Sequence, residues 1–215
     1  MSSSLPPVAS LCTADDETIK QVLDTLFEPA PEIHALALPA IQQKHQRKLA
    51  NPGLSAPDLP GPPSAATIPD TLPPFTSYGD LIKHIGTLMT QLTITPKSSS
   101  QSINPSQKTL HAILGSHPRL GAKKVDSAQS RAEQAQLNND DKDEAQKLAA
   151  LNAEYEAKFP GLRYVVFVNG RGRDVIMEDM RRRIDRGDIR AEEREGVQAM
   201  VDIALDRAQK LGVES

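Results

Sequence analysis

Apolar side chains recur along this chain at the three- and four-residue spacing of one face of an α-helix. The first such stripe comprises Ile19, Val22, Leu23, Leu26 and Phe27. A second stripe covers residues 78–92, with Ser77 in the position of a helix cap and Asp80 in the first turn. Further helices are expected at 110–114, 143–159, 175–184 and 197–211. The pattern predicts an all-α fold of about seven or eight helices.

One short segment, residues 163–168, departs from the helical pattern. It reads Arg-Tyr-Val-Val-Phe-Val and is followed by the turn-forming pair Asn169-Gly170. A single strand cannot form a sheet, so we expect one extended segment within a helical protein.

Proline is concentrated between Asn51 and Pro74, where eight of the 17 prolines lie. A segment with so few backbone donors cannot form a helix or a central strand. We therefore predict a single compact domain over residues 1–215, interrupted by a proline-rich loop at 46–74.

The charge balance and the cysteine count exclude several classes of protein. The 25 basic and 28 acidic residues give a formal charge of −3, which argues against a nucleic-acid partner. The single cysteine, Cys12, excludes an internal disulfide framework and a cysteine-rich zinc site. We expect no signal peptide and no membrane partner, because no apolar run approaches about 20 residues. The expected location is cytoplasmic, with peroxisomal import by a route other than a Ser-Lys-Leu ending left open.

Charged residues dominate the stretch from Glu178 to Glu195, which holds six arginines and seven acidic residues. Glu178 and Asp179 each precede an arginine by four residues, the favourable order on a helix. Because opposite charges nearly cancel, a solvated helix face is the preferred interpretation over a binding patch.

Among the five histidines, His117 has the most distinctive setting. It follows a predicted helix end and precedes Pro118, which disfavours the α conformation at residue 117. That corner could present a catalytic imidazole on a rigid, non-helical backbone. The alternative is a histidine that merely precedes a helix-stopping proline.

Two further positions carry both a structural and a functional interpretation. Ser130 and Glu133 have the spacing of a capping box, while Glu133 and Gln134 could also meet a ligand at a helix N-terminus. Arg207 borders an apolar helix face, where an arginine usually extends its head into water. Its guanidinium could instead point into a pocket and hold a carboxylate or carbonyl oxygen.

Taken in order, these motifs resemble those of the OHCU decarboxylase family, which acts on 2-oxo-4-hydroxy-4-carboxy-5-ureidoimidazoline (OHCU). The resemblance rests on His117-Pro118, Ser130-x-x-Glu133-Gln134, Asn152-x-x-Tyr155-x-x-Lys158-Phe159, the extended run, Leu26-Phe27-Glu28-x-x-Pro31 and Phe75-x-Ser77-x-x-x-Leu81. The chain departs from the family at Arg119, where Asp is common, and at Pro160–Tyr164, where the family usually reads Gly-Phe.

The resemblance implies an all-α homodimer that needs no metal or organic cofactor and converts OHCU to (S)-allantoin in urate degradation. Its catalytic residues would be His117, Glu133 and Arg207, and its substrate-binding residues Pro118, Ser130, Gln134 and Arg171. The main alternative is a non-catalytic helical module that binds a protein partner. A metal-dependent hydrolase is disfavoured, because nothing near His117 supplies two further ligands at suitable spacing.

Overall fold

The structure, a computed structural model, describes residues 5–49, 75–94, 104–122, 128–135 and 142–213. These residues contain helices and no strand, which confirms the all-α prediction for the described part of the chain. The elements are a 3₁₀ helix η1 (Val8–Thr13) and the α-helices α1 (Asp16–Phe27), α2 (Pro31–Leu49), α3 (Tyr78–Thr93), α4 (Pro105–Ser116), α5 (Ala128–Ala135), α6 (Lys142–Lys158), α7 (Arg173–Arg186) and α8 (Ile189–Lys210).

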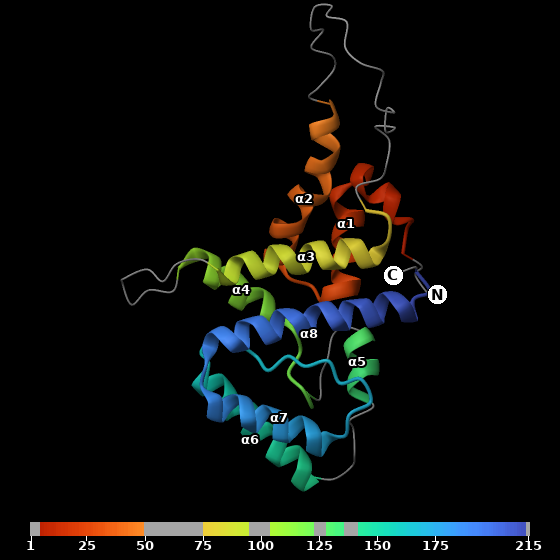
Figure 1. Cartoon of the computed structure of the whole chain (residues 1–215). Helices are drawn as coiled ribbons and strands as arrows, with labels where there is room; N and C mark the ends of the chain where they lie inside the picture. The colour runs from red at the N-terminus through yellow and green to blue at the C-terminus, as the bar shows by residue number, and fades with distance from the viewer. Residues whose placement is uncertain (1–4, 50–74, 95–103, 123–127, 136–141, 214–215) are drawn as a thin grey trace, which may run out of the picture.

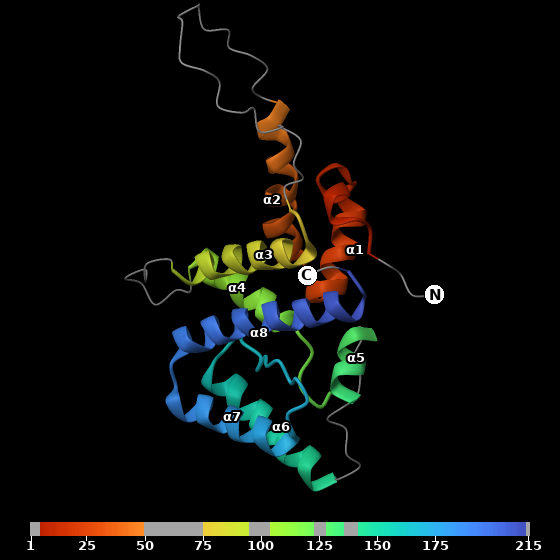
Figure 2. The same ribbon diagram turned by 45° about the vertical axis from the view of Figure 1, so that its right-hand side comes forward.

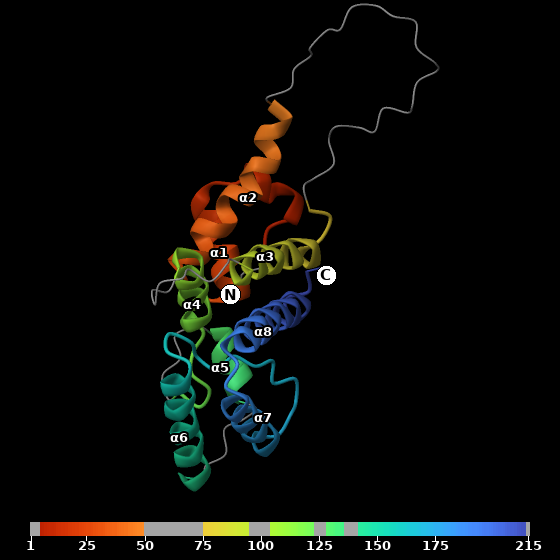
Figure 3. The same cartoon turned by 60° about the vertical axis from the view of Figure 1, so that its left-hand side comes forward.

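Helix α8 crosses the middle of the molecule and separates two groups of helices (Figure 1). Helices α1, α2 and α3 lie on one side of it, and α6 and α7 lie on the other (Figures 1 and 2). Helix α3 lies beside α8 in every view, including that of Figure 3. Gly86 permits this approach, since a Cβ atom there would lie only 2.5 Å from Cγ2 of Val201.

The predicted helix boundaries are set by local residues. The side chain of Ser77 accepts a hydrogen bond from the backbone N–H of Asp80, as expected for the cap of α3. Helix α4 ends at Ser116, and His117 adopts an extended conformation with φ −62° and ψ 135°. The effect of Pro118 on the preceding residue is thereby confirmed.

Residues 162–168 form the expected extended segment, which joins α6 to α7 without strand pairing among the described residues. It passes between α8 and the α6–α7 pair (Figures 1 and 2). Tyr164 anchors it, because its hydroxyl donates a hydrogen bond to Asp179 of α7 at 2.6 Å.

The solvated-face interpretation of residues 178–195 is wrong for three of its charged residues. Arg183, Glu192 and Glu193 are buried. Nε of Arg183 donates to Glu192 at 2.8 Å, and Glu193 pairs with His111 at 2.8 Å. The reason is that α8 begins at Ile189 and packs the second half of the stretch against neighbouring helices, where each buried charge is paired.

The first residues of the predicted loop at 46–74 are helical. Residues 46–49 are the last residues of α2, consistent with the helix-forming Gln-Arg-Lys-Leu sequence that precedes Pro52. Residues 50–74 lie outside the described residues. Within the described chain, no helix has both the length and the apolar character needed to cross a membrane.

Candidate functional site

His117 lies at the C-terminal end of α4 with its backbone and ring held by hydrogen bonds. Nη1 of Arg163 donates to the carbonyl oxygen of His117 at 3.0 Å. Nδ1 of the ring lies 3.2 Å from the carbonyl oxygen of Pro118. Because a carbonyl oxygen only accepts, Nδ1 is the donor in this contact, and in the neutral form of the ring Nε2 is the basic nitrogen.

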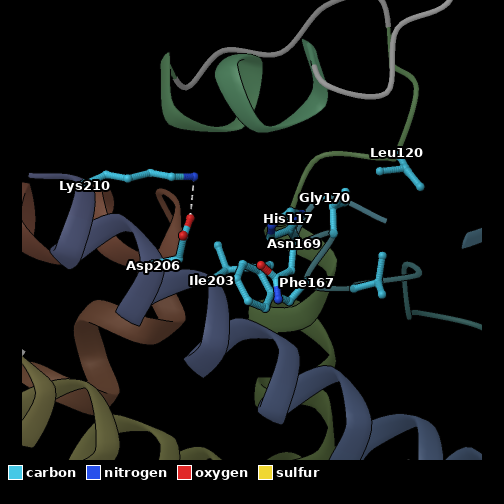
Figure 4. A pocket seen from close by; sticks show the side chains of 10 residues that line it. His117, Leu120, Phe167, Asn169, Gly170, Ile203, Asp206 and Lys210 are labelled. Atoms are coloured by element: carbon cyan, nitrogen blue, oxygen red, sulfur yellow. Dashed lines mark ion pairs between the residues drawn. The ribbon is translucent and has the colours of Figure 1, made fainter. Parts of the chain in front are cut away.

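A cavity of about 240 Å³ opens beside this histidine (Figure 4). This volume lies just below the roughly 300–1,000 Å³ of typical small-molecule sites, so the cavity suits a small metabolite. Its lining residues are His117, Leu120, Val166, Phe167, Val168, Asn169, Gly170, Ile203, Asp206 and Lys210.

The extended segment supplies one wall of this cavity, and the C-terminal half of α8 supplies another. The wall ends in a tight turn, in which Asn169 and Gly170 have φ values of 45° and 72°. Asparagine and glycine are the residues that adopt such values at least cost. The turn predicted from Asn169-Gly170 therefore shapes the cavity rim.

Arg207 occupies a different environment from the one that its apolar helix face suggested. Its side chain is 2% exposed, so the water-directed interpretation is wrong. Nη2 donates to Oε1 of Glu28 at 2.6 Å and to Oγ of Ser130 at 3.0 Å, and Nη1 donates to the carbonyl oxygen of Leu26 at 3.3 Å. Arg207 thus holds a carboxylate, but it is one supplied by the protein itself.

Ser130 completes this cluster and is not a helix cap. It is the third residue of α5, and its hydroxyl donates to Oε1 of Glu28 at 2.5 Å. The capping-box interpretation is wrong because α5 begins at Ala128, two residues before the serine. Helices α1, α5 and α8 therefore meet at the Glu28–Ser130–Arg207 cluster.

Glu28 is a residue of this cluster to which sequence reasoning gave no role. It follows α1 with φ 94°, a strained value for a non-glycine residue. Burial would raise the pKa of its carboxyl group. The charge of Arg207 and the hydrogen bond from Ser130 outweigh that effect, so the pKa lies below the ordinary 4.5, and the charge of His117 acts in the same direction. Two sequence signals marked Glu28: it directly follows the apolar stripe of α1, and it belongs to the family-like segment Leu26-Phe27-Glu28-x-x-Pro31.

The remaining predicted site residues are not among the described residues that line the cavity. Pro118 accepts the hydrogen bond from His117. Arg171 is exposed and folds back onto the carbonyl oxygens of Phe167 and Val168. The backbones of Glu133 and Gln134 belong to α5, but their side chains lie outside the described residues.

Asp206 and Lys210 are further polar groups of the cavity that the sequence did not single out. They lie one helical turn apart on α8 and form an ion pair at 2.6 Å. Arg119, at the position where the sequence departs from the family, is exposed and pairs with Glu156 at 2.5 Å. Among the described residues, no group of three or more potential ligands could hold a metal ion.

Fold and site define an all-α protein in which a fixed histidine faces a cavity of small-metabolite size. Comparison with protein families identifies the family of this protein, because the family model described as OHCU decarboxylase matches residues 60–209. The chain belongs to this family, which comprises decarboxylases of urate degradation. None of the curated proteins matches the chain significantly. Glu28 precedes the matched region, whereas His117, Ser130 and Arg207 lie within it.

Proposed function

We propose that this protein is a cofactor-independent decarboxylase that converts OHCU to (S)-allantoin. The observation that carries the proposal is the position of His117, which is fixed by Arg163 and Pro118 at the wall of the 240 Å³ cavity. A homodimer is part of the same proposal and rests on the family alone.

The substrate can lose CO₂ without an external electron sink. As the bond from the ring to the carboxylate breaks, its electron pair forms a double bond to the ureido-bearing carbon, the π electrons of the C=N bond move onto the ring nitrogen, and that nitrogen takes a proton. The resulting enol becomes the ketone of allantoin when its hydroxyl loses a proton and the ureido-bearing carbon gains one. Delivery of that last proton to one face sets the S configuration.

His117 is the proposed acid–base group for these transfers. With Nδ1–H directed to the carbonyl oxygen of Pro118, Nε2 can take a proton from the substrate hydroxyl. Glu133 is proposed to tune the protonation of this histidine.

Arg207 is proposed to stabilise the negative charge that develops on a substrate oxygen. Glu28 and Ser130 hold its guanidinium in one orientation, so little reorganisation accompanies the reaction. Pro118, Ser130, Gln134 and Arg171 are the proposed contacts to the ring and the ureido group.

A coupled assay tests the reaction directly. OHCU is generated in situ from urate by two upstream enzymes. The formation of (S)-allantoin is then followed by circular dichroism with and without a chelator. Fast, chelator-insensitive formation of the optical signal would support the proposal. A rate equal to spontaneous decay would reject it in favour of a helical module that binds a protein partner.

A further inference from the structure

Two charged side chains of α8, Asp206 and Lys210, line the same cavity as His117 (Figure 4). Nζ of Lys210 donates to Oδ2 of Asp206 at 2.6 Å. The lysine side chain is 58% exposed and the aspartate 23% exposed. The pair therefore stands where the cavity meets solvent.

Arg207 and Arg171, the arginines among the proposed substrate contacts, are held by protein groups and do not belong to the described cavity lining. Arg207 is buried against Glu28 and Ser130, and Arg171 folds onto the carbonyl oxygens of Phe167 and Val168. Among the described lining residues, Lys210 is the one whose side chain carries a permanent positive charge.

We infer that Lys210 binds the carboxylate of the substrate and that Asp206 is the partner from which the lysine turns when the substrate arrives. This assignment rests on the proposed decarboxylase function and names the group that recognises the anionic substrate.

The energetics of the pair suit such an exchange of partners. An exposed lysine–aspartate pair contributes little to stability, because water solvates both charges and ordering a long side chain costs entropy. Lysine also reaches its partner through a flexible stem, so it can turn from one carboxylate to another.

Asp206 weakens the attraction of Lys210 for an anion, because the two charges offset each other. With both residues charged, the pair is neutral toward an approaching ligand. Without Lys210, the aspartate alone would face the cavity and repel an anion, and without Asp206, the lysine would attract an anion more strongly. The two substitutions should therefore act on substrate binding in opposite directions.

A partly exposed cation also suits a reaction that consumes the carboxylate charge. The carboxylate leaves as neutral CO₂, so strong binding of the carboxylate by the lysine would stabilise the ground state and slow the chemical step. A weak, solvated contact helps capture the substrate without that cost. Its effect should consequently appear in KM and not in kcat.

The test compares Lys210→Met, Asp206→Asn and the double variant in the coupled assay. Lys147→Met, an exposed lysine on α6 outside the cavity lining, is the matched control. Lys210→Met should raise KM about tenfold and leave kcat nearly unchanged, while Asp206→Asn should lower KM about threefold. The KM of the double variant should lie between those of the two single variants. The far-ultraviolet circular dichroism spectrum of each variant should match that of wild type.

An unchanged KM in Lys210→Met, or a rise in KM in Asp206→Asn, would overturn this assignment while leaving the decarboxylase function intact. A loss confined to kcat in Lys210→Met would also overturn it. A wild-type protein without activity would overturn both the assignment and the function on which it rests.

Discussion

The guanidinium of Arg207 and the carboxylate of Glu28 form a buried ion pair at 2.6 Å, although 179 positions separate them in the chain. Both side chains are almost fully buried, with 2% and 3% exposure. The pair joins the first helix to the last beside the candidate catalytic residue His117. It therefore links the stability of the fold to the geometry of the site.

Removal of either partner should destabilise the protein strongly. We expect Glu28→Ala to lower the free energy of unfolding by about 3–5 kcal/mol, because it leaves the buried Arg207 charge uncompensated. Urea denaturation measures the change. Glu154→Ala, which breaks an exposed pair with Arg181, is the control and should leave stability nearly unchanged. Equal stability of Glu28→Ala and wild type would contradict a buried charge pair.

The contribution of Glu28 should also depend on pH. Its pKa is lowered in the folded protein, so its stabilising effect is complete above the ordinary value of 4.5 and is lost as the pH falls through the folded pKa. Wild type and Glu28→Gln should thus differ most near neutral pH and converge as the pH falls below 4.5 and through the folded pKa. Urea midpoints measured across that range would show the convergence. A difference that stays constant with pH would show that Glu28 is not charged in the fold.

Replacement of His117 by alanine should lower kcat by about 10²–10⁴ while leaving the helical content unchanged. Arg163→Met should lower kcat about tenfold, because it removes the hydrogen bond to the His117 carbonyl oxygen and so shifts the ring without removing it. Arg181→Met, an exposed arginine on α7, serves as the control and should retain full activity. Near-normal turnover by His117→Ala would exclude the proposed acid–base role.

The close approach of α3 and α8 should make Gly86 intolerant of a larger side chain. Gly86→Ala should lower the free energy of unfolding by about 1–3 kcal/mol, even though alanine favours helices, because its Cβ would lie 2.5 Å from Cγ2 of Val201. Gly115→Ala is the matched control, since its Cβ would lie at an ordinary 3.4 Å from the oxygen of Gly161.

A second variant separates a steric clash at Gly86 from other causes. Adding Val201→Ala to Gly86→Ala removes the methyl group that is in the way, so the double variant should be more stable than Gly86→Ala alone. Thermal melts of wild type, Gly86→Ala, Val201→Ala and the double variant give the comparison. Strictly additive losses would argue against a steric clash between these residues.

Much of the local structure followed from residues close together in the sequence. The apolar stripe of α1 is buried as predicted, Ser77 caps α3, and Pro118 keeps His117 extended at the end of α4. These features depend on hydrogen bonds and steric contacts that reach only a few residues, so the sequence alone determines them. Family membership was likewise visible in short motifs and agrees with the match over residues 60–209.

The partners of charged side chains depended on the tertiary structure. Ser130 has the spacing of a cap, yet it bonds Glu28 from α1, and the acidic Glu192 and Glu193 are buried despite their highly charged sequence surroundings. Whether Arg207 extends into water or binds a carboxylate is set by which helix packs against α8. The sequence by itself determined the helical character of the chain, the cap of α3 and the corner that carries His117. Helix packing decided which charges meet and which line the cavity, because those contacts join segments that no local pattern connects.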